Sequence, residues 1–371
     1  MGQPKMADDF SSVFEPPLDQ TPDVDELVRA AMEWHFSPLT GSPYWVERAK
    51  TLGFDPRKDV QSQADLQLFA GVPVDWSSIP ADQLIPRGNA GRSVRHGVYE
   101  SGGATGAPKR IIDATSRRRN VEWQSRMLDE QGFPAQGGGW LHIGPTGPHI
   151  MAKNITSLGE IRGHLSYFVD LDPRWVRRCL AEGRKDEFRR YIDHILDQVK
   201  DVLASQDIRL MSSTPRILET IAGRDDVYRL VREKVQGMIW GGTSMDAETL
   251  RLFEEEVFPQ ARLAGAYGNT MMGVAPQRTR RAGDAAPCVF RPYYPYTIVD
   301  LVDPDEPSRR VADGEQGRVV VTALTRDHFN PPTLERDLAV RQPSADGFPG
   351  IELSDVRPYE SASTTVVEGV Y

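Results

Sequence analysis

A ten-residue segment, SGGATGAPKR at residues 101–110, combines the residue types that bind phosphate. Its glycines allow positive φ and close approach of the backbone, so that consecutive N–H groups can point at an anion. Its serine and threonine add hydroxyl donors, and its lysine adds a charge that can reach a terminal phosphate. The candidate phosphate-binding residues are Ser101, Gly103, Thr105, Gly106 and Lys109.

The pattern of the nucleotide-binding P-loop, GxxxxGK[ST], is not met by this segment. Pro108 precedes the lysine and Arg110 follows it, which argues against a P-loop ATPase. An ordinary glycine-rich hairpin turn is the alternative if the segment is considered alone.

The elements around the segment alternate between strands and helices. An amphipathic helix is expected at 23–36, with shorter helices at 43–53 and 63–70, and short strands flank the glycine segment at 98–100 and 110–115. Further strands are expected at 139–145, 165–171, 208–213, 235–242 and 261–268, and helices at 117–133, 184–205, 214–223 and 246–259.

This alternation predicts an α/β fold with a mostly parallel sheet flanked by helices. Ligands bind at the carboxyl ends of the strands in such sheets, which is where GPTGPHI, SSTP, GGTS and YGNT fall. The three arginines at 117–119 begin the helix at 117–133, and we expect them on a solvated face.

From about residue 287 the sequence becomes rich in branched and aromatic residues, notably at 288–303 and 316–325. We therefore expect a smaller β-rich subdomain there. The predicted organisation is an α/β core over 1–286, which carries the glycine segment, and the β-rich subdomain over 287–371.

The composition excludes several classes of protein. The 371 residues carry a formal net charge of −9, which argues against a general binder of nucleic acid or of a membrane surface. Only Cys179 and Cys288 are present, too few for a metal cluster of cysteines, and this fits a reducing cytoplasm. No apolar run reaches the roughly 18 residues of a membrane span. We expect a cytoplasmic protein and predict no set of metal-ligating side chains.

Four segments carry a resemblance to one family. SGGATGAPKR resembles the phosphate-binding signature [ST]SGTTGxPK of the adenylate-forming superfamily, which includes acyl- and aryl-CoA ligases and nonribosomal adenylation domains. Residues 237–259 resemble its strand–GGE–helix segment, 264–273 its YGxTE segment, and 317–341 the stretch from GExxVT through PLIRYxxGD. The segments occur in the family's order, and the phenylacetate-CoA ligase branch is the most similar.

The resemblance implies ATP-dependent activation of a carboxylic acid as its acyl-adenylate, with the glycine loop around the phosphates. It assigns Tyr267, with Gly268 beside it, to stacking on adenine and Asp337 to the ribose hydroxyls, with Arg357 near the hinge. The alternative for Tyr267 is a buried core tyrosine, and the alternative for the pair Gly241 and Gly242 is a plain turn. It further implies catalytic roles for Lys109, Thr105 and Thr270, and a backbone wall beside adenine and the acyl group at Gly241, Gly242 and Thr243.

The acyl pocket implied by the resemblance includes His149, Ala266 and Asn269. A satisfied structural histidine is the alternative for His149. These residues suggest a small pocket with one polar wall, so we expect a small aromatic acid, with natural-product biosynthesis as the setting. The implied acceptors are coenzyme A, a carrier protein or an amine.

Three departures from the family pattern matter. Met271 replaces the glutamate that binds magnesium, and a thioether cannot act as a hard oxygen donor, so Mg²⁺ is expected to bind through the phosphates, Thr270 and water. The segment PPTLERD is shorter than PLIRYxxGD. The family's C-terminal lid domain is missing, so we expect a truncated chain, a lid supplied by another protein, or a non-catalytic homologue that binds nucleotide or acid.

Overall fold

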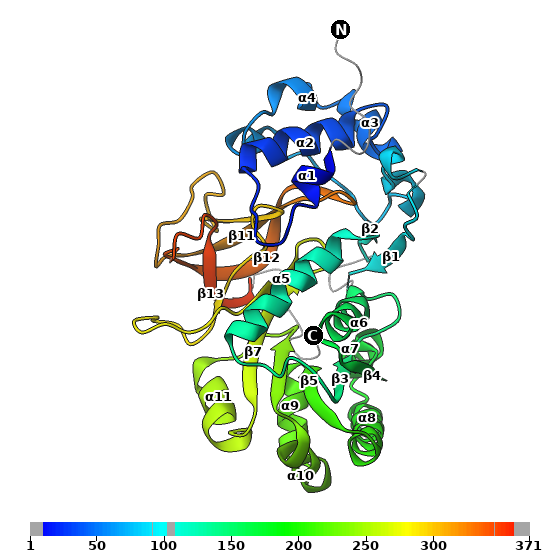
Figure 1. The fold of residues 1–371 in the computed structure, drawn as a ribbon, viewed down its shortest axis with the longest axis vertical. Coiled ribbons are helices and arrows are strands. Elements are labelled where there is room, and N and C mark those ends of the chain that lie inside the picture. Colours follow the sequence, from blue (N-terminus) through cyan, green and yellow to red (C-terminus); the bar gives the residue numbers. More distant parts are fainter. Residues whose placement is uncertain (1–9, 91, 102–107, 345, 360–371) are drawn as a thin grey trace.

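The computed structural model describes residues 10–90, 92–101, 108–344 and 346–359. It contains two large sheets and a helical N-terminal segment (Figure 1). In that view the N-terminal helices lie at one end, the antiparallel sheet lies in the middle, and the parallel sheet with its helices forms the other end. Helix α5 (Ser116–Glu130) crosses diagonally between the two sheets.

The first sheet has six strands in the order β4–β3–β5–β6–β7–β8, all parallel except β8. Helices on both faces bury its apolar residues, which explains the near-continuous hydrophobic runs of its strands. The strands are β3 (Gly139–Gly144), β4 (Leu165–Asp170), β5 (Ile208–Ser213), β6 (Gly237–Gly241), β7 (Arg262–Asn269) and β8 (Gly273–Pro276). The helices are α5, α6 (Ile150–Arg162), α7 (Pro173–Ala181), α8 (Lys185–Ser205), α9 (Pro215–Ala222), α10 (Asp225–Lys234) and α11 (Ala247–Leu252), which continues as the π-helical turn η5 (Phe253–Val257).

The second sheet is antiparallel, with the order β10–β11–β12–β13–β9. Its strands are β9 (Val289–Phe290), β10 (Thr297–Val302), β11 (Gln316–Leu324), β12 (Phe329–Gln342) and β13 (Glu352–Pro358). The N-terminal elements pack on this sheet in one aromatic cluster that includes Trp34, Trp45 and Phe329. Those elements are α1 (Ser11–Phe14), α2 (Val24–Phe36), α3 (Pro43–Ala49), α4 (Pro56–Asp59), η2 (Ala64–Phe69), η3 (Ala81–Leu84) and η4 (Arg87–Asn89).

A short antiparallel hairpin, β1 (Gly97–Glu100) and β2 (Arg110–Asp113), carries the glycine segment. Its position next to α6 is fixed where the Glu100 N–H donates to the Pro148 carbonyl at 2.8 Å. The segment therefore meets the first sheet at the turn after β3.

The predicted fold class is confirmed: a mostly parallel sheet flanked by helices stands beside a separate antiparallel sheet. The division of the chain at residues 286 and 287 stays a prediction. One expectation is wrong, because Arg117 is buried at 8% exposure, whereas Arg118 is exposed as expected. Helix α5 presents Arg117 to the β7–β8 turn, where its guanidinium donates to the Thr270 carbonyl.

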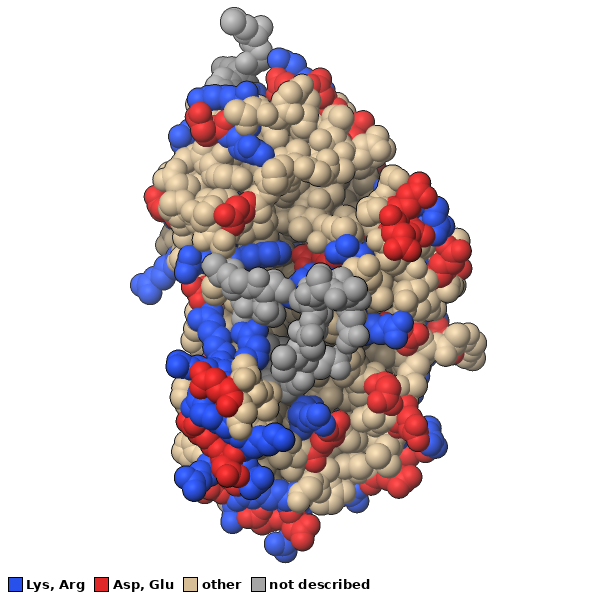
Figure 2. All heavy atoms as spheres, turned by 180° about the vertical axis from the view of Figure 1, so that it is seen from behind, with Lys and Arg blue, Asp and Glu red and all other residues tan. Residues whose placement is uncertain are grey.

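The face in Figure 2 shows acidic and basic side chains interspersed at both ends of the molecule. Within the described residues, no helix combines the length and the apolar composition needed to cross a bilayer.

Candidate nucleotide and acyl site

The base of the glycine segment is closed by two hydrogen bonds between its first and last described residues. The Ser101 N–H donates to the Lys109 carbonyl at 2.9 Å, and the Lys109 N–H donates to Ser101 Oγ at 2.9 Å. Glu100 adds ion pairs to Arg110 and Arg174, at 3.0 and 2.6 Å. The predicted residues Gly103, Thr105 and Gly106 lie outside the described residues.

Two predicted nucleotide-binding residues, 70 positions apart, are in direct contact. The Tyr267 hydroxyl at the end of β7 donates to Asp337 Oδ2 on β12 at 2.9 Å. Burial raises the pKa of Tyr267 well above its usual value, and the charges of Asp337 and Glu335 add to this effect, so the hydroxyl keeps its proton. The contact joins the carboxyl edge of the first sheet to the second sheet.

Glu335 lies two residues before Asp337 on β12 and was not anticipated from the sequence. It is 9% exposed, and its Oε1 has no hydrogen-bond partner. Burial raises the pKa of Glu335, and the Lys109, Arg336 and Arg318 charges oppose this rise while Asp337 adds to it. Burial also raises the pKa of Asp337, against the Tyr267 hydrogen bond and Arg336. Tyr267 and Asp337 are thus in contact, with a second buried carboxylate, Glu335, two residues away on the same strand.

The glycine pair after β6 lies against the neighbouring strand β7. Gly241 is opposite Ala266, and a Cβ at Gly241 would be 2.5 Å from the Ala266 carbonyl oxygen, so only glycine fits. Gly242 has φ of +81°, which turns the chain at the sheet edge. Thr243 follows in this turn and is partly buried. These residues and Ala266 form a narrow backbone surface beside Tyr267 and Gly268.

The turn between β7 and β8, whose sequence departs from YGxTE, is buried. Asn269 Oδ1 accepts from the N–H groups of Met271 and Met272, at 2.8 and 3.0 Å, and so shapes the turn. Thr270 is 9% exposed, and its carbonyl accepts from the Arg117 guanidinium. Met271 is 3% exposed and packs in the apolar cluster of the N-terminal helices and the second sheet.

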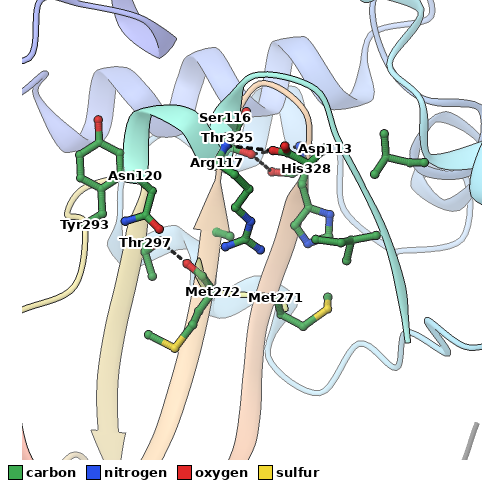
Figure 3. Close-up of a pocket in the computed structure, with 13 residues that line it drawn as sticks. Asp113, Ser116, Arg117, Asn120, Met271, Met272, Tyr293, Thr297, Thr325 and His328 are labelled. Atoms are coloured by element: carbon green, nitrogen blue, oxygen red, sulfur yellow. Dashed lines mark hydrogen bonds between the residues drawn. The ribbon is translucent and has the colours of Figure 1, made fainter. Parts of the chain in front are cut away.

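Figure 3 shows Arg117 reaching from α5 toward the two methionines, with Asn120 beside it. Asn120 holds β8 through both of its amide atoms, accepting from the Val274 N–H at 2.7 Å and donating to the Val274 carbonyl at 2.9 Å. No group of three His, Cys, Asp or Glu side chains suited to a metal occurs among the described residues. A magnesium ligand at position 271 does not fit this packing.

Behind Arg117 lies a buried cluster of charges. The Lys153 ammonium of α6 pairs with Asp113 at the end of β2, and Asp113 Oδ1 also accepts from the Arg117 N–H at 2.9 Å. Asp327 Oδ2, from the β11–β12 connection, accepts from the N–H groups of Thr115 and Ser116, each at 2.8 Å. The start of α5 is thus held by side chains from the β1–β2 hairpin and from the second sheet.

His149 stands at the N-cap of α6 and is 8% exposed. Burial lowers its pKa and Arg174 acts in the same direction, while Asp172, Asp170 and Glu100 oppose them. It therefore lies among the charged groups at the base of the hairpin, on the side of β3 and β4.

Arg357 is placed apart from the nucleotide residues. On β13 it lies opposite Leu338 in the register, whereas Asp337 lies opposite Pro358. Its guanidinium donates to Gln316 at 3.2 Å, and the residue is exposed. Side chains of successive strand residues leave opposite faces, so Arg357 and Asp337 do not converge.

Sequence reasoning missed Arg117 and Glu335 because their burial is decided by contacts between distant segments. The available signal was weak: Glu335 is a charge two residues before the predicted ribose aspartate, on the same face of an extended strand.

No protein-family model matches the chain, and no curated protein does. Solved structures do match in fold. A 2-hydroxyisobutyryl-CoA ligase in an open conformation, in complex with 2-HIB-AMP and CoA, has a TM-score of 0.58 at 14% identity over 86% of this chain and 70% of the ligase. The same ligase in its thioesterification state gives 0.56 at 13% identity over 90% and 66% of the two chains. In its postadenylation state with R3-HIB-AMP, the ligase has a TM-score of 0.54 at 13% identity, over 90% of this chain and 66% of the ligase. The chain therefore has the fold of an acyl-CoA ligase crystallised with an acyl-adenylate, which is the fold that its four motifs predict.

Proposed function

We propose that the chain binds ATP and activates a carboxylic acid as its acyl-adenylate. A carboxylate oxygen attacks the α-phosphorus, a new P–O bond forms, and pyrophosphate leaves with the electron pair of the broken P–O bond. The observation that supports the proposal is the hydrogen bond of Tyr267 to Asp337, because separate sequence motifs assign these two residues to adenine and ribose.

Each residue has a role suited to its chemistry. Lys109 and Ser101 contact the phosphates, where positive charge and hydroxyl donors neutralise charge that develops during attack. Asp337 accepts from both ribose hydroxyls, which requires it to be ionised and to exchange the Tyr267 hydroxyl for the ribose. The Tyr267 ring stacks on adenine. The backbone at Gly241, Gly242 and Ala266 forms one wall of the acyl pocket, with His149, Thr243 and Asn269 near its rim.

The position of the usual magnesium ligand holds Met271, which is packed in an apolar cluster. Mg²⁺ is commonly bound by one or two carboxylates together with substrate phosphates. We derive no step through the ion, and we propose that any Mg²⁺ arrives on the phosphates of ATP.

The proposed substrate is a small, aromatic acid, as the phenylacetate-CoA ligase resemblance implies. The ligase of similar fold was crystallised with CoA, so CoA is the first acceptor to test, before a carrier protein or an amine. A role in natural-product biosynthesis and a lid supplied by a separate protein belong to the same proposal.

A second candidate is a homologue that binds nucleotide or acid without turnover. The burial of Met271 at 3% exposure favours it, since the position cannot regain a metal contact without repacking.

Calorimetry with ATP and with AMP, with and without Mg²⁺, tests the proposal, followed in the same samples by pyrophosphate release against a panel of aryl and short acyl acids. We expect Lys109→Ala to weaken ATP binding about 10- to 150-fold, the cost of one charged hydrogen-bonding group. Lys58→Ala, at an exposed lysine of α4, is the matched control. Binding without acid-dependent release supports the second candidate. Absence of nucleotide binding refutes the ATP-dependent proposal, and absence of both nucleotide and acid binding refutes both.

A further inference from the structure

A polar pair lies inside the first sheet, where its neighbours are apolar. His142 on β3 and Ser212 on β5 are each 3% exposed and stand opposite each other in the register. His142 Nδ1 and Ser212 Oγ are 2.9 Å apart, and the Trp140 Nε1–H donates to the same Oγ at 3.3 Å. The other ring nitrogen, His142 Nε2, is buried and has no hydrogen-bond partner. None of the four family motifs includes either residue.

The register places this pair directly beneath the candidate acyl wall. Ser212 lies opposite Ile239, and Ile239 lies opposite Ala264. Side chains repeat on one face every second residue, so Gly241 and Ala266 form the next row toward the carboxyl edge. Glycine and alanine fill little space, so the row above His142 is built from small residues (Figure 1 shows β3, β5 and β7 in this sheet).

The free nitrogen points toward that edge. Gly144 lies two residues after His142 on β3, and a Cβ placed there would be 2.8 Å from His142 Nε2. Because residue 144 is glycine, no side chain from this position fills the space beside Nε2. The carbonyl of Pro145 is close enough to act on the ring, yet it makes no hydrogen bond with Nε2.

The hydrogen bonds of Ser212 fix which ring nitrogen carries the proton. Ser212 Oγ accepts from Trp140, and its own proton has His142 Nδ1 as an acceptor at 2.9 Å. If Nδ1 carried a proton instead, it would also donate to Oγ and leave the buried serine proton without that acceptor. The arrangement that pairs the serine proton puts the hydrogen on Nε2, as a donor that has no acceptor among the described residues.

The ring is neutral at physiological pH. Burial lowers the pKa of His142 to about 4, and it outweighs the carbonyls of Pro145 and Ser212 and the charge of Asp170. A neutral N–H donor is suited to a neutral oxygen acceptor, and it gives no charge to hold a second carboxylate.

We infer that His142 forms the far end of the acyl pocket and that the acid substrate carries a neutral hydrogen-bond acceptor, a hydroxyl, ether or carbonyl oxygen, at the end remote from its carboxylate. This inference rests on the proposed function, because it requires the carboxylate to lie at the sheet edge near Lys109. His142 is then a specificity-determining residue, and Ser212 is the positioning residue that fixes its tautomer.

The test uses sulfamoyl-adenosine mimics of acyl-adenylates, which bind without turnover. The probes are matched pairs: the phenylacetyl and 4-hydroxyphenylacetyl mimics, and the butanoyl and 4-hydroxybutanoyl mimics. We expect the wild-type chain to bind the oxygen-bearing member of at least one pair about 10-fold more tightly. His142→Phe keeps the size and removes the donor, and is expected to reduce that preference to less than about 2-fold.

A second variant and a spectroscopic readout guard against misfolding of the first. Ser212→Ala keeps the ring and frees its tautomer, so a partial loss of preference is expected. Nitrogen NMR of the unliganded protein should show His142 protonated on Nε2, and a proton on Nδ1 overturns the donor assignment.

The calorimetric outcomes separate this inference from the proposed function. If AMP binds but no pair is distinguished, or if His142→Phe keeps the preference, only this inference is overturned. If neither AMP nor any mimic binds, the proposed function fails as well.

Discussion

The two ends of one short segment, Tyr267 to Met272, have opposite environments. Tyr267 is the residue that the sequence motifs assign to adenine, and its hydroxyl meets the Asp337 carboxylate. Four residues later, Met271 is packed among apolar side chains, and the backbone before it is held by a buried arginine. The same short turn thus holds one residue against a polar group of the second sheet and another within an apolar cluster.

The difference lies in which partners support each end. The Tyr267 end is held by β12 of the second sheet, whereas the Met271 end is held by α5 through Arg117 and Asn120. Variants can therefore alter one end without the other, and the following four changes test this separation.

The largest effect is expected from Arg117→Met, because it leaves the Thr270 carbonyl without its buried cationic partner and removes a positive charge that acts on Asp113 and Asp327. Removing one member of a buried charged cluster lowers the free energy of unfolding by about 3–5 kcal/mol. Urea unfolding measures it, with Arg118→Met on the exposed face of the same helix as control, at less than about 1 kcal/mol. Equal losses in the two variants would contradict the buried role.

Met271→Glu restores the family's residue at its own position. Because the site is 3% exposed and apolar, we expect the free energy of unfolding to fall by about 2–4 kcal/mol, with no gain in Mg²⁺-dependent ATP binding. Met271→Leu, which keeps the volume, should cost less than about 1.5 kcal/mol. A stable glutamate variant that binds ATP more tightly with Mg²⁺ would show that the turn opens to the site.

Asp337→Asn changes the hydrogen-bond partner of Tyr267, at the other end of the segment from Tyr267 to Met272. It removes the ionised acceptor for the ribose, so AMP affinity measured by calorimetry is expected to fall about 10- to 150-fold, while the Met271 end is unaffected. Asp305→Asn, in an exposed turn of the same sheet, is the control. Unchanged affinity in Asp337→Asn would remove the ribose assignment.

The smallest effect concerns pH. Burial raises the pKa of Glu335, so the folded chain binds this proton more tightly than the unfolded chain, and stability falls as pH rises from the usual glutamate range, about 4.3, through the raised value. Glu335→Gln lacks this fall. It should therefore be more stable than wild type at neutral pH, with the difference vanishing below about pH 4 in urea unfolding series. Glu315→Gln, at an exposed carboxylate, controls for removal of a charge, and a pH-independent difference would contradict the explanation.

The first sheet was predictable because its information is local. Apolar runs such as GMIWG and RLAGA, punctuated by glycine turns and amphipathic helices, specify strand and helix without reference to distant contacts. The strand β12 was harder, since Pro331, Pro332 and four charged residues interrupt any strand pattern, and only its pairing with β11 and β13 makes it extended.

For the site, the motifs named Tyr267 and Asp337, and the structure places them in contact. The burial of Arg117 could not be read from the sequence, because RRR at the start of an amphipathic helix is the usual composition of a solvated face. Its guanidinium donates to the Thr270 carbonyl and is favoured by the charges of Asp113 and Asp327, which come from separate parts of the chain. His142 lies within the otherwise apolar strand GWLHIG and Ser212 begins SSTP at the end of β5, but the sequence did not indicate that the two side chains pair.

Helix α5 contacts both sheets within its first two turns. Asp327, between β11 and β12, accepts from the Ser116 N–H at its start, and Asn120 bonds both backbone groups of Val274 in β8. If either sheet separated from this helix, these hydrogen bonds would break and leave buried polar groups unpaired. The amide hydrogens of β8 and of the β11–β12 connection should therefore exchange with solvent through a shared opening event, so that two sheets of unlike topology behave as one cooperative unit.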